Sequence, residues 1–326
     1  MNLERALACI FLVGCGARTE LTASATGPGA EDAGPDGALA VLFGGCCRPP
    51  GETLLSDTWT WNGARWTPLD VTGPSTRDQA AMASLGGTLT LFGGIHGEPL
   101  DDTWTWSGGA WAQLDVAGPS ARVQPAIAPL DGRLVLFGGD TEGFGQLGDT
   151  WTWDGTRWTQ LSVPGPSART GAVMAPLDGK LVLFGGYGGD RGEYLNDLWT
   201  WDGAAWSQVA AAGPSPRQNA AMAPLGGQLV LFGGWTGTPT DFNPVADTWT
   251  WDGTSWTERN VEGPPPRADA AMVALNGALV LFGGQTTDAE TDGGILADTW
   301  IWDGVAWTSR DVTGPSARFC ASMAVP

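Results

Sequence analysis

Short apolar runs alternate with clusters of glycine and aspartate from about residue 38 to the C-terminus. Runs such as LVLFGG and TWTW have the length of a β-strand and are too short for a typical helix. A run that ends in Phe-Gly-Gly recurs every 45 to 50 residues. The phenylalanines of the six Phe-Gly-Gly motifs are Phe43, Phe92, Phe137, Phe184, Phe232 and Phe282. A period of this length predicts one all-β domain made of six repeated units.

Four short strands, named a to d, are expected in each unit. Strand a is a segment such as residues 80–85, strand b precedes Gly-Gly, strand c is the TWTW run, and strand d is the W-T-x-L segment after it. The pairs at 131–132, 178–179 and 276–277 are Asp-Gly or Asn-Gly, which predicts two-residue type I′ turns between a and b because both central residues need positive φ. Asp-Gly pairs between c and d predict a similar turn there.

The repeat resembles a blade of the Kelch-repeat β-propeller family, to which the central domain of galactose oxidase is similar. The diglycine of that family ends strand b in all six copies. Its tyrosine position is held by Trp61, Trp106, Trp153, Trp201, Trp251 and Trp302, and its closing tryptophan by Trp66, Trp111, Trp158, Trp206, Trp256 and Trp307. The resemblance covers residues 38–326 and implies a six-bladed β-propeller of four-stranded antiparallel blades.

The order of the strands predicts how the ring closes. The first copy starts with strand b, whereas the last copy continues beyond Arg318 into a segment that matches strand a. An open row of blades would leave two exposed sheet edges. We therefore expect the C-terminal segment to complete blade one.

The N-terminus has the pattern of an export signal. Residues 1–14 carry a charged start and an apolar middle that is too short to span a bilayer. Leu12 to Cys15 reads LVGC and resembles a bacterial lipobox, which implies that Cys15 is lipidated; a plain secretory signal is the alternative. Residues 15–37 then form a flexible linker, and the protein is expected to be exported and anchored by lipid at the outer membrane or cell surface of a bacterial envelope.

Charge and tryptophan content limit the choice of partner. The formal charge of -19 argues against nucleic acid and against direct binding to anionic membrane surfaces. Eighteen of the 19 tryptophans belong to the repeated pattern, so that their abundance is not evidence of sugar binding. Trp235 alone lies outside the pattern and needs another explanation.

Three cysteines remain once Cys9 is removed and Cys15 is lipidated. In an exported protein they favour a disulfide from Cys320 to Cys46 or Cys47, which would close the ring. A bridge between the adjacent Cys46 and Cys47, with Cys320 reduced, is the alternative.

Antiparallel strands place the b–c and d–a connections on one face of the disc, here called the loop-rich face; the a–b and c–d turns form the turn-rich face. All the variation in loop length falls on the loop-rich face, where binding residues commonly lie. Six residues there are candidates for binding: Trp235, Tyr187, Tyr194, His96, Phe144 and Phe242. Packing of these side chains within their own loops is the alternative.

One arginine precedes each inner strand on that face, at Arg77, Arg122, Arg169, Arg217, Arg267 and Arg318. Such a ring could bind an anionic ligand near the channel. Each unit also has an aspartate before strand c, at Asp57, Asp102, Asp149, Asp197, Asp247 and Asp298, so that structural ion pairs are the alternative.

A calcium loop is suggested by Asp288, Glu290 and Asp292 followed by Gly293, in which alternate oxygens could converge on Ca²⁺. The later acidic ligand of an EF-hand is absent at Thr299, and a solvated acidic loop is the alternative. Calcium is the one cofactor that the sequence suggests.

Catalysis is not expected. The copper radical oxidases with Kelch-like propellers need two histidines, whereas the chain has one, and a triad or zinc site built on several histidines meets the same obstacle. We predict a monomer that binds a protein or glycan through the loop-rich face, an expectation that rests on fold analogy. The alternatives are a carbohydrate-active enzyme, similar to a sugar epimerase, with carboxylates in the channel, and a structural envelope protein.

Overall fold

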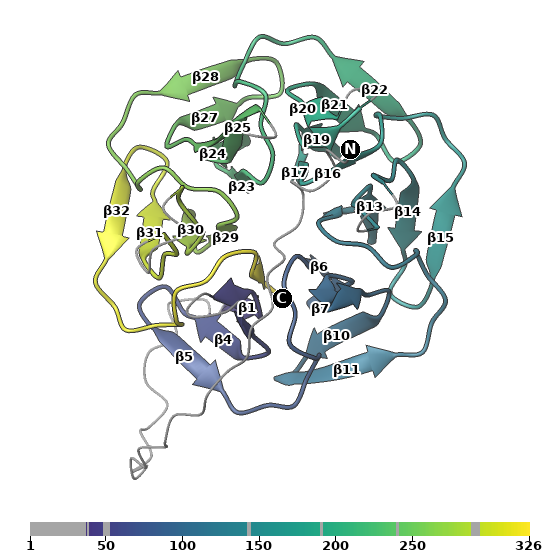
Figure 1. Cartoon of the computed structure of the whole chain (residues 1–326), viewed down its shortest axis with the longest axis vertical. Coiled ribbons are helices and arrows are strands. Elements are labelled where there is room, and N and C mark those ends of the chain that lie inside the picture. The colour runs from purple at the N-terminus through teal and green to yellow at the C-terminus, as the bar shows by residue number, and fades with distance from the viewer. Residues whose placement is uncertain are drawn as a thin grey trace, which may run out of the picture.

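The computed structural model of the chain describes residues 37, 39–47, 53–141, 145–189, 192–238, 241–287 and 294–326, with only the backbone at 241 and 242. These residues form six four-stranded antiparallel sheets arranged as a ring around a central axis (Figure 1). The predicted six-bladed, all-β propeller is confirmed. Cys15, Phe144 and the calcium candidates Asp288, Glu290 and Asp292 lie outside the described residues.

Blade 1 is built from both ends of the described chain. Its strands, from the axis outward, are β33 (Ser322–Ala324), β1 (Ala40–Phe43), β4 (Thr58–Trp61) and β5 (Trp66–Leu69). Strand β33 pairs with β1 in antiparallel register, with Val41 opposite Ala324 and Phe43 opposite Ser322. The C-terminal strand therefore completes the first blade, as predicted.

The other five blades each come from one continuous segment. Blade 2 has β6 (Ala81–Leu85), β7 (Thr88–Phe92), β10 (Thr103–Ser107) and β11 (Ala110–Leu114); blade 3 has β12 (Ala126–Leu130), β13 (Arg133–Phe137), β14 (Thr150–Trp153) and β15 (Trp158–Leu161). Blade 4 has β17 (Val173–Leu177), β18 (Lys180–Phe184), β21 (Leu198–Trp201) and β22 (Trp206–Val209). Blade 5 has β23 (Ala221–Leu225), β24 (Gln228–Phe232), β27 (Thr248–Trp251) and β28 (Trp256–Arg259), and blade 6 has β29 (Ala271–Leu275), β30 (Ala278–Phe282), β31 (Thr299–Trp302) and β32 (Trp307–Arg310).

The a–b turns have the predicted geometry. Both central residues have positive φ, for example 48° at Asp131 and 72° at Gly132. The similar turn expected at the four Asp-Gly pairs between c and d is wrong, because only the glycine of each pair has positive φ. There the aspartate instead accepts backbone hydrogen bonds with its side chain, as Asp154 Oδ1 does from the N–H groups of Thr156 and Arg157 at 2.9 and 3.0 Å.

Each b–c connection folds back on itself on the loop-rich face, which the sequence did not predict. Four of them are short hairpins: β2 (Cys46–Cys47) with β3 (Thr53–Leu54), β8 (Ile95–His96) with β9 (Glu98–Pro99), β19 (Tyr187–Gly188) with β20 (Glu193–Tyr194), and β25 (Trp235–Thr238) with β26 (Asp241–Pro244). Strand β16 (Arg169–Thr170) adds to the third hairpin. The other two connections close through single bridges, Asp140 with Gln146 and Gln285 with Ile295.

The hydrophobic core lies between neighbouring blades. The closing tryptophan of each blade packs on the strand-b phenylalanine of the preceding blade, as Trp158 does on Phe92 with ring centroids 5.2 Å apart. In five of the six blades its indole N–H also donates to a buried threonine of that preceding blade; Trp158 Nε1 lies 3.0 Å from Thr103 Oγ1. A Cβ atom at the linker residue Gly118 would approach the same indole to 2.7 Å, so that only glycine allows this contact.

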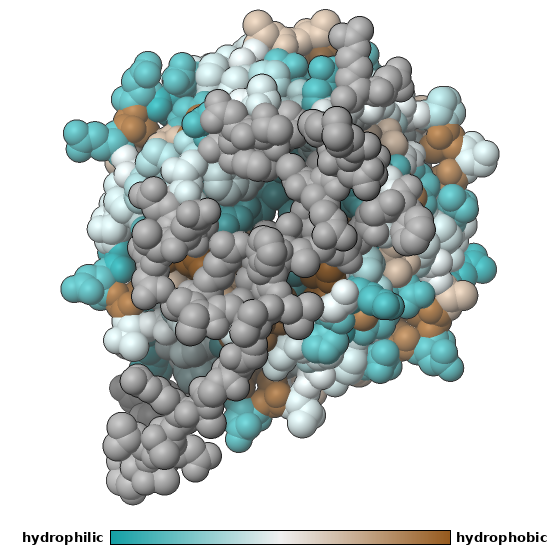
Figure 2. All heavy atoms as spheres, in the orientation of Figure 1, coloured by the Kyte–Doolittle hydropathy of each residue, from teal (hydrophilic) through white to brown (hydrophobic). Residues whose placement is uncertain are grey.

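The described surface that is visible in Figure 2 is mostly polar. Hydrophobic groups are scattered singly around the rim in Figure 2, outside what the grey atoms cover. Within the described residues, no helix offers a segment of the length and hydrophobicity that a membrane span requires.

Candidate functional site

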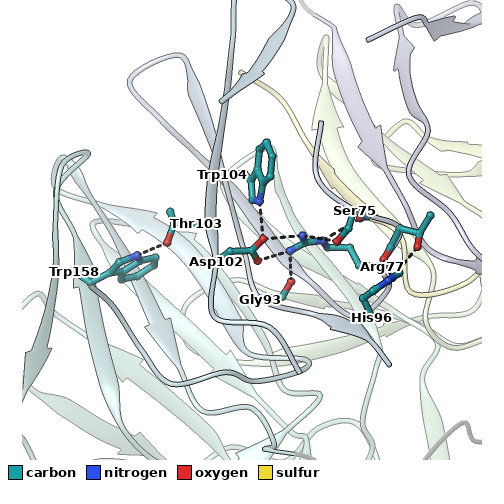
Figure 3. A network of polar contacts seen from close by, with 9 residues as sticks. Ser75, Arg77, Gly93, His96, Asp102, Thr103, Trp104 and Trp158 are labelled. Carbon is teal, nitrogen blue, oxygen red and sulfur yellow. Dashed lines mark hydrogen bonds and ion pairs between the residues drawn. The ribbon is translucent and has the colours of Figure 1, made fainter. Parts of the chain in front are cut away.

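Each repeated arginine joins two neighbouring blades. Arg77 donates its guanidinium bonds to blade 2: Nη1 and Nη2 contact Asp102 at 2.5 and 2.8 Å, and Nη1 contacts the Gly93 carbonyl at 3.0 Å (Figure 3). Its backbone bonds to blade 1 instead, because its N–H donates to the Leu55 carbonyl and its carbonyl accepts from Gly45 N–H. Arg77 thus connects the two blades at the loop-rich face.

The same arrangement recurs around the whole ring. The five other ion pairs are Arg122–Asp149, Arg169–Asp197, Arg217–Asp247, Arg267–Asp298 and Arg318–Asp57. Arg318 takes its backbone bonds from blade 6 and its side-chain bonds from blade 1. The Arg318–Asp57 ion pair therefore joins blade 6 to blade 1, where the two ends of the described chain meet.

In five of the six arginines every guanidinium N–H group is already bonded within the protein. Arg267 makes four such bonds, because Pro265 stands where the other units have a serine. In Arg77 the two remaining N–H groups donate to Ser75, through its carbonyl at 3.3 Å and its hydroxyl at 3.0 Å. All six arginines are at most 1% exposed. The structure therefore favours the structural ion pair over the anion-binding ring.

The paired aspartates are strong hydrogen-bond acceptors. Asp102 also accepts from the indole N–H of Trp104 at 2.7 Å. Burial opposes ionisation of Asp102, but the hydrogen bonds and charge of Arg77, with the Trp104 bond, hold its pKa below the usual value. The equivalent aspartates of the other five blades have lowered pKa values for the same reasons.

A second ring surrounds the channel mouth on the loop-rich face. The residue two positions after each arginine has a left-handed backbone, with φ from 49° to 63°; these channel-ring residues are Gln79, Gln124, Gly171, Asn219, Asp269 and Cys320. The N–H of each donates to the carbonyl of the one before it, and Gln79 N–H donates to Cys320, at 2.8 to 3.2 Å. Six backbone hydrogen bonds thus form a closed circle.

Asp269 collects side-chain donors from several loops. Its Oδ2 accepts from Trp235 Nε1 and Gln285 Nε2, both at 2.9 Å, and its Oδ1 accepts from Cys320 Sγ at 3.2 Å. Burial raises the pKa of this carboxyl group, although these hydrogen bonds oppose the shift. The sequence did not point to Asp269 as a site residue; a signal for its left-handed backbone was available, since three of the six ring positions are Gly, Asn or Asp, the residues that best tolerate positive φ.

Trp235 now has an explanation that is independent of the blade pattern. It is 8% exposed and packs with Tyr187, Tyr194 and Ala268, while its N–H binds Asp269. The rings of Tyr187 and Tyr194 meet edge to face at 5.9 Å. These three aromatic candidates therefore pack within their loops, whereas His96 is exposed, with its Nδ1 2.7 Å from the Thr76 carbonyl (Figure 3).

Two buried polar atoms lie beside this aromatic cluster without a hydrogen-bond partner among the described residues: Tyr194 Oη and Gln218 Oε1. Burial raises the pKa of Tyr194 to about 12, with Tyr187 and Asp269 adding to the shift. Gln218 opposes the shift, so that the two groups face each other, but without the geometry of a hydrogen bond. Phe242, the remaining candidate, belongs to β26, where only the backbone is described.

The predicted disulfide is absent: no bridge joins Cys320 to Cys46 or Cys47, and none joins Cys46 to Cys47. Backbone pairing brings Cys46 opposite Phe319, next to Cys320. The left-handed backbone of Cys320 directs its sulfur to Asp269, while Cys47 Sγ donates to the Thr53 carbonyl at 3.6 Å. Burial also raises the pKa of Cys47, which disfavours the reactive thiolate.

No group of three or more His, Cys, Asp or Glu side chains suited to a metal ion occurs in the described part of the chain. Two hollows lie away from the channel, near the outer strands: one of about 270 Å³ beside Glu258 and Val305, and one of about 650 Å³ beside Gln160 and Pro164. Neither includes a residue of the channel ring.

Comparison with known proteins agrees with the fold. Residues 105–257, from β10 in blade 2 to β28 in blade 5, match the family model described as the KLHDC2/KLHL20/DRC7 Kelch-repeats domain. No curated protein matches the chain significantly. The match identifies Kelch repeats in the centre of the chain, and the same pattern of Gly-Gly, Arg and Trp continues on both sides of it.

Proposed function

We propose that this propeller, with Kelch repeats at its centre, is a non-catalytic binding protein that engages a protein or a glycan through its loop-rich face. One observation carries the proposal: the six blades share one rigid framework of ion pairs and tryptophans, yet their b–c connections differ in length and sequence. Variable loops on a constant scaffold are the usual position of a binding surface. Kelch repeats commonly mediate protein–protein interaction, which supports the same function.

The loop-rich face can be tested by changing one hairpin. In the test variant, residues 236–243 are replaced by a two-residue Asn-Gly turn, which keeps Trp235 and the pairing around it. In the control variant, the turn-rich face is changed by Asp178→Asn, which keeps the left-handed turn. A glycan array and an affinity capture, with the purified chain as bait, should give ligands that bind the control and lose affinity for the test variant. Ligands that bind both variants equally would contradict the proposal.

A carbohydrate-active enzyme is the second candidate, because Asp269 is a carboxyl group with a raised pKa at the channel mouth. Its two oxygens already accept three side-chain hydrogen bonds, which favours a structural role. Turnover of a sugar by the chain, lost in Asp269→Asn, would establish catalysis instead.

Export, lipidation of Cys15 and a place at the bacterial cell surface complete the proposal. They rest on the charged and apolar pattern of residues 1–14 and on the LVGC sequence that ends at Cys15. Mass spectrometry of the mature protein should give a diacylated N-terminal Cys15. An unmodified N-terminus at another residue would contradict the lipid anchor and leave the binding function intact. A structural role in the envelope would be indicated by loss of envelope integrity in a deletion strain when no ligand can be found.

A further inference from the structure

The hydrogen-bond circle at the channel mouth uses the backbone N–H groups of the channel-ring residues and leaves their carbonyl oxygens able to accept further hydrogen bonds. Each channel-ring N–H donates along the ring to its neighbour, so that none of these six N–H groups points into the channel. Each carbonyl oxygen retains a second lone pair, since it accepts one of these bonds and can accept two. The backbone of the mouth is therefore suited to a ligand that donates hydrogen bonds.

The size of the ring limits what can enter. Backbones joined by hydrogen bonds have Cα atoms about 5 Å apart, so that opposite Cα atoms in a six-membered ring are about 10 Å apart. Such an opening admits one side chain or a small molecule and excludes a folded element.

The side chains of the ring add further acceptors. Gln79, Gln124 and Asn219 are half-buried and carry carboxamide oxygens, and Asp269 carries a carboxylate. The Asp269 oxygens are occupied by their loop donors, so that this residue contributes charge rather than direct contact.

Among the described residues around the mouth, charged side chains that lie outside the six buried ion pairs are acidic rather than basic. Among the described basic residues, six are in the buried ion pairs, and the other six lie at the turn-rich face or in the outermost strands: Arg65, Arg133, Arg157, Lys180, Arg259 and Arg310. Acidic side chains precede the ring at Asp78 and lie in the b–c connections at Glu98, Asp140 and Glu193. A recess lined by one sign of charge concentrates ions of the opposite sign.

An independent observation also points to a donor ligand. Gln218 directly precedes the ring residue Asn219, is 9% exposed, and its Oε1 has no partner among the described residues. Tyr194 Oη, which faces Gln218, is in the same condition. An unfilled buried acceptor is costly unless a donor reaches it.

We propose that the channel mouth is a recognition site for an ammonium or guanidinium group, supplied by a lysine or arginine side chain of a protein partner. The ring carbonyls and the carboxamides of Gln79, Gln124 and Asn219 receive its N–H groups, and Asp269 supplies the balancing charge. This proposal rests on the proposed function and specifies the chemistry of its partner.

The test uses the purified full chain and isothermal titration with blocked glycine pentapeptides that carry one central arginine, lysine, norleucine or glutamate. The arginine and lysine peptides should bind, whereas norleucine and glutamate should bind at least about tenfold more weakly. Asp269→Asn should reduce the affinity for the arginine peptide by at least about tenfold, because it removes the charge and preserves the size of the side chain. The matched control Asp178→Asn, which removes one charge from the opposite face, should change it by less than about twofold.

A second variant covers the case in which Asp269→Asn does not fold. Gln218→Met removes the buried acceptor at nearly constant side-chain volume and should also reduce the affinity for the arginine peptide. Equal binding of the glutamate peptide, or equal losses in Asp269→Asn and Asp178→Asn, would overturn the inference. If propylammonium binds as tightly as the lysine peptide, the inference of a protein partner is wrong and the site is one for small amines. If no peptide binds while a ligand of the loop-rich face is captured, this inference fails and the proposed function stands.

Discussion

Arg217 shows what a single repeated residue contributes to the ring. Its guanidinium donates to Asp247 at 2.7 and 2.8 Å, to the Gly233 carbonyl and to Ser215, and it is 1% exposed. Arg217→Gln should lower the free energy of unfolding by about 3–5 kcal/mol, because it leaves buried acceptors and a carboxylate without a partner. Urea denaturation followed by circular dichroism measures this.

The control for that variant is Arg157→Gln. The Arg157 side chain is 78% exposed, and its ion pair with Asp154 lies in solvent at 3.4 Å. Its loss should change the free energy of unfolding by less than about 1 kcal/mol. Equal effects of the two substitutions would show that burial of the guanidinium does not matter.

The hydrogen bond from the closing tryptophan to a threonine of the preceding blade should also contribute to stability. Thr103→Val should cost about 1–2 kcal/mol in the free energy of unfolding, since it leaves the buried Trp158 N–H without its acceptor. Thr67→Val, on exposed β5, is the matched control and should be nearly neutral. Leu198 already takes the place of this threonine in blade 4, where it packs with Trp256. A neutral Thr103→Val would mean that apolar packing alone holds the tryptophan.

Strand β33 is the element on which ring closure depends. Met323 and Ala324 are buried between blade 1 and its neighbours, and their backbones cover the edge of β1. Deletion of residues 322–326 should reduce the free energy of unfolding by at least about 3 kcal/mol and cause association through the exposed edge. Deletion of residues 325 and 326 alone is the control; calorimetry and light scattering separate the two results.

The four strands of a blade could be predicted from sequence because each is a local pattern, repeated six times, of apolar residues and turn signals. The partners of Arg217 could be anticipated in part, since a repeated arginine with a repeated aspartate suggested an ion pair. The b–c hairpins could not, because their pairs are short and their sequences differ. The hydrogen bonds of Asp269 could not either: its donors come from Trp235, Gln285 and Cys320, which only the tertiary fold brings together.

The pH dependence of stability belongs to the whole molecule, because six blades contribute to it. The six paired aspartates have lowered pKa values, so their contribution to stability is present above the unfolded pKa of about 3.9 and is lost as the pH falls through their folded pKa. Asp269 acts in the opposite sense, since its pKa is raised and its contribution is lost as the pH rises. Six groups against one should make the protein unfold more readily below about pH 4.

Urea midpoints measured between pH 2 and 7 test this expectation. A midpoint that stays constant down to pH 2 would contradict it. In Asp269→Asn the six lowered groups remain, so that the fall in acid should persist while the opposing contribution disappears.

The pairing of Val41 with Ala324 places the two ends of the folded body where every other blade has a two-residue turn. The chain ends therefore interrupt the ring at a place where the other blades have a simple turn, and the blade architecture is the same on both sides. A chain whose ends are joined there by Asn-Gly and opened instead at Asp178-Gly179 should fold to the same propeller, with the seam moved to blade 4. Retention of the near-ultraviolet tryptophan spectrum would demonstrate that this ring has no obligatory first blade.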